Sequence, residues 1–203
     1  MLEWTHLQLA DGPNLRLVAS GAGIRAIEFE RDREIPEDLE NTAGRGRPDP
    51  EGTPTRGSAP PMRPEAGLRG LRNDGNPLLV EAARQLRAYF AGTLREFHLP
   101  LDMEGTDFQM RVWRQLETIP YGETRSYAQI AAAIGSPSAV RAVGAANGAN
   151  PVAIVVPCHR VIGSSGKLVG YGGGLPLKKR LLGLEGAGGW GARAARGSAD
   201  LLK

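Results

Sequence analysis

Cysteine, histidine and aromatic residues are scarce in this chain of 203 residues. It has one cysteine, Cys158, three histidines, and aromatic side chains at 5% of its positions. A single cysteine excludes an intramolecular disulfide. A tetrahedral zinc site would have to draw on carboxylates and on His6, His98 and His159 alone. We therefore expect neither a metal nor another cofactor.

Long apolar runs are also missing. The first 12 residues have no basic segment followed by an apolar stretch, which a signal peptide would show. The longest apolar runs, such as Val152–Val156, are far shorter than the ~20 residues that span a membrane. We expect a soluble, cytoplasmic protein with a reduced thiol and no membrane partner.

Residues 35–77 contain no aromatic side chain, and 15 of these 43 residues are proline or glycine. Such a segment buries too little apolar surface to offset the entropy of ordering it. It is predicted to be a flexible insertion within an N-terminal domain, residues 1–105. Residues 106–186 are predicted to form a second domain, and the Gly- and Ala-rich residues 187–203 a disordered tail.

Acidic residues are sparse in the C-terminal half. Residues 106–203 carry 12 Lys and Arg against 5 Asp and Glu, while residues 1–105 carry 13 against 17. A basic half suggests a polyanionic partner, with nucleic acid as the first candidate. A basic face without any partner fits the charge pattern equally well.

The N-terminal domain begins with three short, roughly alternating segments, residues 5–10, 15–20 and 24–29. Turns rich in glycine and proline separate them, which predicts a β-meander. A helix is predicted over residues 78–92, with an apolar face made of Leu79, Ala82, Ala83, Leu86 and Phe90.

Three helices are predicted in the next stretch. A capping box at residues 106–109 starts the first, and residues 120–122 end it. The second covers residues 127–134. Ser136-Pro137 offers an N-cap and a first-turn proline for the third, which runs to about Gly148. The last two helices are typical of a helix-turn-helix, but a plain helical hairpin fits equally well.

Arg141 lies in the third of these helices among small residues. Small side chains let a helix approach a DNA backbone closely, and one long cation can then enter a groove. They would equally let two helices pack together, which would leave Arg141 as a solvated surface residue.

Cys158 follows the apolar residues 152–156, which are predicted to be buried and extended. A cysteine in this position is usually a packing residue. Here Pro157 fixes the backbone before it, and His159 and Arg160 follow at once. Because either cation would favour the thiolate, we predict a reactive thiol.

Two further features follow the cysteine. Tyr171 precedes three glycines, a pattern typical of a loop where a flat ligand meets backbone. A last helix is predicted from Pro176 to Gly186. Glu185 lies at its C-terminal end, where the helix dipole disfavours an acid. It is either solvent-exposed or it orients a histidine, and Cys-His-Glu has the logic of an activated nucleophile.

These motifs together resemble the O6-alkylguanine-DNA alkyltransferases, also called methylated-DNA–protein-cysteine methyltransferases. The resemblance covers residues 108–186 almost without a gap. Its core is Asn150-Pro151, Pro157-Cys158-His159-Arg160-Val161, Gly170-Tyr171, Gly174-Leu175, Lys178, Leu181-Leu182 and Glu185. It implies an α+β fold, with a small ribonuclease-H-like N-terminal α/β domain. The C-terminal domain would be mostly helical, with a winged-helix-like helix-turn-helix.

The resemblance also implies a reaction. A monomer would bind double-stranded DNA containing O6-alkylguanine through the minor groove and flip the base out. A methyl or other alkyl group would pass irreversibly, once per chain, from O6 of guanine (or O4 of thymine) to Cys158. His159 would activate the thiol through a bound water, and Glu185 would hold His159. Tyr127 would help to rotate and polarise the base, and Asn150 would support the turn before Cys158.

Further residues are implied in DNA contact and in the guanine pocket. Arg141 would fill the space of the flipped nucleotide, with Tyr127, Ala139 and Ser138 beside it on the DNA. The pocket would consist of Val161, Tyr171, Gly172, Gly173, Asn147 and Pro157. Some members of the family carry a zinc site with cysteine ligands, which has no counterpart here.

Two other classes of function stay open. One is a non-catalytic protein that binds alkylated DNA on the same scaffold, although such relatives lack the acceptor cysteine. The other is a Cys/His hydrolase or a thiol redox protein. A redox protein would need a resolving thiol, which a chain with one cysteine does not have.

Overall fold

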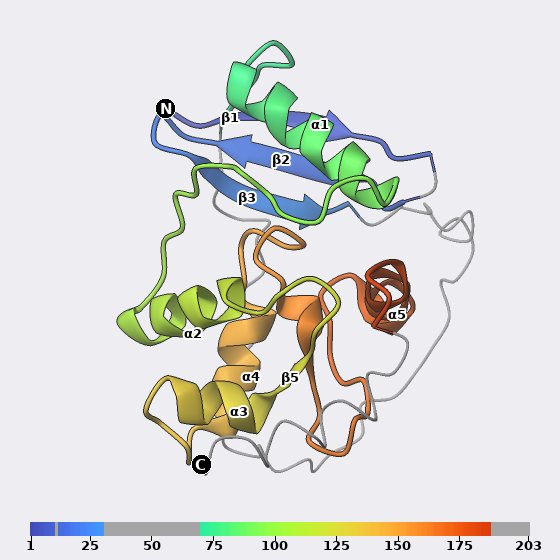
Figure 1. Cartoon of the computed structure of the whole chain (residues 1–203). Coiled ribbons are helices and arrows are strands. Elements are labelled where there is room, and N and C mark those ends of the chain that lie inside the picture. Colours follow the sequence, from blue (N-terminus) through green and yellow to red (C-terminus); the bar gives the residue numbers. More distant parts are fainter. Residues whose placement is uncertain (11, 31–69, 188–203) are drawn as a thin grey trace, which may run out of the picture.

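The computed structural model describes residues 1–10, 12–30 and 70–187. Most of the predicted insertion (residues 35–69 of 35–77) and most of the predicted tail (residues 188–203 of 187–203) therefore lie outside the described residues. Figure 1 shows a sheet with one helix above and a mostly helical part below, in keeping with the expected α+β class.

A four-stranded sheet forms the N-terminal part. Its strands are β1 (Glu3–Leu7), β2 (Leu15–Ala19), β3 (Ile24–Phe29) and β4 (Leu71–Arg72), in the order β3-β2-β1-β4. The first three are antiparallel neighbours, which confirms the predicted meander. In β2 every residue except Arg16 is buried, so this central strand lies in the core.

The predicted insertion is too long at its C-terminal end. β4 lies within residues 35–77 and pairs in parallel with β1. Leu71 and Arg72 are both exposed, so the strand is held by backbone hydrogen bonds. Composition reports only on side chains and therefore misses such a strand.

Helix α1 (Pro77–Phe90) packs on the sheet. Asn76 caps it by accepting hydrogen bonds from the backbone N–H groups of Leu78 and Leu79. Most of the predicted apolar face is buried, as expected. Near the end of α1 Tyr89 is fully buried, whereas Phe90, which was predicted to lie on the apolar face, is only partly buried.

Helices α2 (Asp107–Glu117) and α3 (Tyr127–Ala133) both begin with a complete capping box. Thr106 caps α2, which confirms that prediction, and Ser126 caps α3. The indole N–H of Trp113 in α2 donates to the carbonyl of Ala146, 2.8 Å away, and so ties α2 to α4 (Val140–Gly148).

Helix α4 (Val140–Gly148) begins later than predicted. Residues 136–139 form a turn closed by a hydrogen bond from the Ala139 N–H to the Ser136 carbonyl. Ser136 is therefore not the N-cap, and Pro137 is not in the first helical turn. A type I turn and a first helical turn share sequence preferences, which explains the error.

Residues 152–156 are almost entirely buried, as predicted, but they are not extended. Ile154 has a φ of 74°. The Val155 N–H donates to the Ala153 carbonyl, so the chain reverses in a tight γ-type turn at a β-branched residue. An apolar run alone cannot separate a buried strand from a buried turn.

The segment that carries Cys158 lies between this turn and the last helix. It consists of the 3-10 helix η2 (Cys158–Arg160) and strand β6 (Val161–Ile162), which pairs in parallel with β5 (Arg125–Ser126). Helix α5 spans Gly174–Leu184. Ala187, predicted to belong to the tail, is buried against Ile162 and Leu182 and so belongs to the fold.

One hydrophobic core extends through both parts of the molecule. The Ile27 N–H in β3 donates to the Pro151 carbonyl over 2.9 Å, and Ile24 bridges to Leu101. The N-terminal sheet is thus joined directly to the turn that precedes Cys158. None of the helices within the described ranges is long and apolar enough to cross a membrane.

Candidate active site

Two tight turns deliver Cys158 to the first position of η2. The second is centred on Pro157, whose φ of −83° and ψ of 61° are those of an inverse γ-turn. The Cys158 N–H donates to the Val156 carbonyl. Asn150 braces both ends of this stretch. Its amide donates to the Val156 carbonyl (2.8 Å), and its oxygen accepts from the Val152 N–H (3.1 Å).

The Cys158 thiol is buried, and its surroundings favour the protonated form. Burial raises its pKa, while a hydrogen bond from the Asn150 side chain and the charge of Lys178 act in the opposite direction. Because burial prevails, the thiol needs a base before it can act as a nucleophile.

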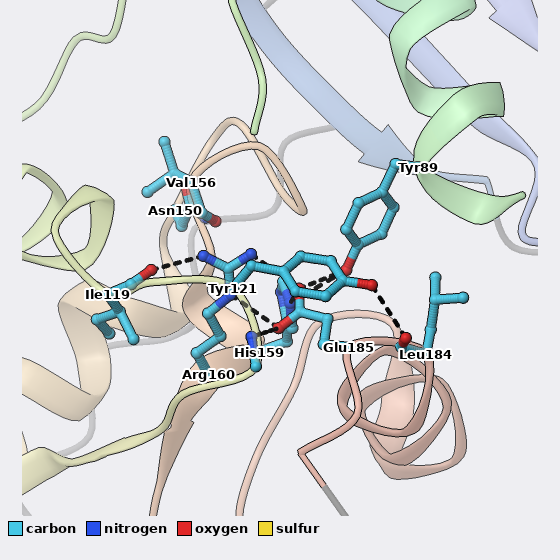
Figure 2. A network of polar contacts seen from close by, with 10 residues as sticks. Tyr89, Ile119, Tyr121, Asn150, Val156, His159, Arg160, Leu184 and Glu185 are labelled. Atoms are coloured by element: carbon cyan, nitrogen blue, oxygen red, sulfur yellow. Dashed lines mark hydrogen bonds and ion pairs between the residues drawn. The ribbon is translucent and has the colours of Figure 1, made fainter. Parts of the chain in front are cut away.

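His159 is fully buried and its imidazole is held in one orientation. Its Nε2 lies 3.0 Å from Oε1 of Glu185 (Figure 2). A carboxylate only accepts, so Nε2 carries the proton and Nδ1 has a free lone pair. Within the described part of the chain, Nδ1 is buried with no hydrogen-bond partner. Burial lowers the pKa of His159 and so keeps the ring neutral, although Glu185 opposes this effect.

Glu185 is buried, so the alternative of a solvent-exposed acid is wrong. Arg160 makes two hydrogen bonds to its carboxylate, from Nε (2.9 Å) and from Nη2 (2.8 Å). Burial alone would raise the pKa of Glu185, but the bonds from His159 and Arg160 outweigh it and lower the pKa to about 2. These bonds also offset the unfavourable end of the helix dipole.

The expectation that Arg160 favours the thiolate is not met by its geometry. The guanidinium is directed at Glu185 and at the Ile119 carbonyl, 2.6 Å from its Nη1 (Figure 2). Lys178 is the cation that acts on Cys158. Its Nζ is held by the carbonyls of Val169 (2.9 Å) and Gly170 (3.2 Å), and burial lowers its pKa to about 8.

Tyr127 is half-buried at the start of α3 and faces the same site. The Lys178 Nζ lies 5.9 Å from its ring centroid. Burial, and then the nearby Cys158, raise the pKa of Tyr127 to about 12. The phenol therefore remains a hydrogen-bond donor at neutral pH.

The predicted pocket residues fall into two groups. Tyr171, Gly172 and Gly173 line a cavity of about 480 Å³ that is also lined by Pro13, Phe29 and Glu30 of the N-terminal part. The Tyr171 hydroxyl is buried without a hydrogen-bond partner among the described residues.

The second group, Asn147, Pro157 and Val161, is buried around Cys158 and does not line this cavity. The Asn147 amide donates to the Cys158 carbonyl over 3.4 Å, and its own oxygen has no partner in the described ranges.

The predicted DNA-contacting residues lie on the helix pair α3–α4. Arg141 and Ser138 are exposed, and Ala139 is half-buried just before α4. Among the residues described, no carboxylate pairs with Arg141. The helix pair thus presents one unpaired cation to solvent.

Two contributions to the site were not predicted from the sequence: the hydroxyl of Tyr89 and the effect of the Lys178 charge on Cys158. Tyr89 in α1 donates to Glu185 Oε1 over 2.7 Å (Figure 2). Its position on the buried face of α1 indicates a packing role. No neighbouring residue in the sequence indicates that its hydroxyl makes a polar contact in the site. In the described ranges, no group of three or more His, Cys, Asp and Glu side chains is placed to hold a metal ion.

Two family models match the chain. The 6-O-methylguanine DNA methyltransferase ribonuclease-like domain matches residues 11–103, and the DNA binding domain of the same family matches residues 107–187. The methylated-DNA–protein-cysteine methyltransferase of Mycolicibacterium paratuberculosis is 69% identical over 104 residues, which are 51% of this chain and 63% of that protein. The constitutive Bacillus subtilis protein of the same name is 58% identical over 119 residues, 58% of this chain and 72% of that protein.

Solved structures agree over a longer span. The Mycobacterium tuberculosis O6-methylguanine methyltransferase superposes with a TM-score of 0.67 at 44% identity, covering 91% of this chain and 93% of that one. A structure of the Mycobacterium tuberculosis protein in complex with DNA gives 0.66 at 42% identity, covering 91% of each chain. Both domains are matched, and the chain belongs to the 6-O-methylguanine DNA methyltransferase family.

Proposed function

We propose that this chain repairs DNA by direct reversal, moving an alkyl group from O6 of guanine to Sγ of Cys158. The observation that carries the proposal is the His159 ring. Glu185 holds its Nε2 proton and leaves Nδ1 free to act as a base, in the residue directly after the buried Cys158. Curated relatives are named for transfer of a methyl group from DNA to a protein cysteine.

The transfer step balances without a cofactor. The thiol proton passes to Nδ1 of His159 through a water molecule, and the resulting imidazolium faces the Glu185 carboxylate. Sγ then attacks the alkyl carbon while the bond from that carbon to O6 breaks. The electron pair stays with guanine, which takes up one proton as it leaves. Tyr127, whose raised pKa keeps it protonated at neutral pH, is the proposed donor of this proton, and it regains one from the His159 imidazolium through solvent, so both side chains end as they began.

The product explains why the reaction happens once. A thioether on Cys158 carries no leaving group that water can use. The chain has no second cysteine that could regenerate the first. One protein molecule therefore removes one alkyl group.

The base has to leave the helical stack before Cys158 can reach it, because the thiol is buried and a stacked base is blocked. We propose that α3 and α4 act as a helix-turn-helix in the minor groove. Arg141 would occupy the gap left by the flipped nucleotide. Its exposure and its lack of an ion pair among the described residues suit this role, as does the DNA bound to a relative. We infer that the protein acts on O6-alkylguanine as a monomer, and thymine O4 is a further candidate position.

A non-catalytic lesion-binding protein is the alternative, and it would use the same DNA surface. The test is intact-protein mass after mixing with excess duplex containing O6-methylguanine. We expect a gain of one methyl group on Cys158, stopping at one equivalent. The Cys158→Ala variant should bind the duplex and gain nothing. Binding without any gain in the wild type would favour the alternative, and turnover beyond one equivalent would favour a hydrolase.

A further inference from the structure

The N-terminal part reaches the active site through one hydroxyl group. Tyr89 lies near the end of α1 and is fully buried. Its hydroxyl donates to Oε1 of Glu185 over 2.7 Å, and the same oxygen is 3.4 Å from Nε2 of His159. Figure 2 shows Tyr89 entering from α1 while Glu185 comes from the end of α5.

We propose that Tyr89 is a positioning residue that fixes the tautomer and the orientation of His159 for alkyl transfer. This inference rests on the proposed function and deepens it. It makes the N-terminal domain a part of the active site as well as a scaffold.

The hydrogen-bond inventory supports this role. A phenol has one proton to donate, and Tyr89 gives it to Glu185, so only its lone pairs are left for His159. Glu185 Oε1 also has nothing to donate. Nε2 of His159 therefore lies between two acceptors and has to carry the ring proton. That leaves Nδ1 as the unprotonated nitrogen, which is the state a base requires.

Packing alone does not require the hydroxyl. The Tyr89 ring lies against Phe90, Phe97 and Tyr121, with ring centroids 5.5, 5.2 and 6.2 Å away. A phenylalanine would keep all three contacts. Burial raises the pKa of Tyr89, so the hydroxyl stays a donor throughout the neutral range.

The charged and titratable groups around His159 determine how loss of the Tyr89 hydroxyl changes the protonation of the ring. Lys178 in α5 and Glu185 at its C-cap act on the ring, as does Arg160 from the segment of His159 itself, and the Tyr171 ring approaches from the glycine-rich loop. Without the Tyr89 donor, Glu185 shares its charge among fewer partners and holds a protonated His159 more strongly. A larger share of the protein then starts with its base already protonated.

The test compares Tyr89→Phe with Tyr121→Phe. Tyr121 belongs to the same aromatic cluster, but its hydroxyl donates to the Leu184 carbonyl. Single-turnover transfer is followed at saturating O6-methylguanine duplex across pH. Tyr89→Phe should slow transfer about tenfold at neutral pH, a typical effect of a lost partner behind an active-site histidine. The acid limb of its rate profile should move to higher pH. DNA affinity should not change, and Tyr121→Phe should match the wild type.

A second readout does not depend on transfer. Nitrogen-15 NMR of the free protein reports which ring nitrogen of His159 is protonated, and the exposed His6 and His98 serve as references. The wild type should carry the proton on Nε2, and Tyr89→Phe should titrate at higher pH. If the wild type transfers methyl and Tyr89→Phe shows the same rate, profile and nitrogen shifts, this inference is overturned and the proposed function stands. If the wild type transfers nothing, the proposed function fails, and unchanged nitrogen shifts would overturn this inference separately.

Discussion

Asn150 is the residue on which the shape of the acceptor segment depends most. Ile154, two residues before Val156, is β-branched and has a φ of 74°, a conformation that costs roughly 1–2 kcal/mol relative to ordinary backbone. Asn150 bonds both flanks of this turn, at Val152 and at Val156. It therefore offsets local strain at the point where the chain turns toward Cys158.

We expect Asn150→Ala to destabilise the protein by about 2 kcal/mol, because it leaves the buried Val152 N–H without its partner and removes one of the two hydrogen bonds to the Val156 carbonyl. It should also slow methyl transfer, since the segment carrying Cys158 is no longer held. Urea unfolding and single-turnover rates measure the two effects.

Asn76→Ala is the matched control for Asn150→Ala. Asn76 caps α1, far along the chain from Cys158, and losing such a cap costs about 1 kcal/mol. It should lower stability and leave transfer at the wild-type rate. Equal transfer rates in both variants would contradict the role given to Asn150.

At the scale of elements, the helix pair α3–α4 carries both a residue proposed to contact DNA and a residue that faces the candidate active site. Tyr127 begins α3 and faces the active site, while Arg141 is exposed in the first turn of α4. One rigid unit thus carries the group that would enter the stack and a group that would meet the flipped base.

We expect Arg141→Ala to slow repair of duplex DNA by about tenfold while single-stranded substrate is repaired at nearly the wild-type rate. The reason is that only a duplex leaves a gap to be filled, and an unfilled gap costs part of the unstacking energy. Arg84→Ala, which removes an exposed arginine paired with Glu81 on α1, serves as the control for charge. Equal slowing on both substrates would rule out the gap-filling role.

Sequence patterns predicted the elements that depend on local chemistry. The capping box of α2 and the meander are set by residues close together in the chain, and both are present. The start of α4 and the turn at residues 152–156 were not predicted, because a proline and an apolar run each suit more than one backbone shape.

The candidate site shows the same division. Cys158, His159 and Glu185 could be found from motifs, and the structure brings them together. The hydroxyl of Tyr89 could not, since its contacts with His159 and Glu185 span 70 and 96 residues. The sequence shows that Arg160 is close to Cys158 along the chain. It does not show that the guanidinium is directed at Glu185, because only the fold brings Glu185 near.

At the scale of the whole molecule, the buried charges make stability depend on pH. The pKa of Glu185 falls from 4.5 to about 2 on folding, which contributes roughly 3 kcal/mol of stability. This contribution is complete above pH 4.5 and is lost as the pH falls toward 2. The pKa of His159 is also lowered on folding, from 6.5, so its protonation below that pH favours the unfolded chain. Both effects act in the same direction.

We therefore expect the free energy of unfolding to fall as the pH is lowered from about 6.5 to 3, as measured by urea unfolding at each pH. Glu185→Gln should be less stable at neutral pH, because Arg160 and His159 lose a charged partner, and its stability should fall less steeply in acid. Glu81→Gln is the control, since Glu81 also has a pKa of about 2 but lies on the surface in an ion pair with Arg84. Solvent screens that pair, so this variant should follow the wild-type curve. If the curves of the wild type and Glu185→Gln were parallel, the acid sensitivity would have to arise outside the active-site network. The residues that hold the base for alkyl transfer would then contribute little to the stability of the joined domains.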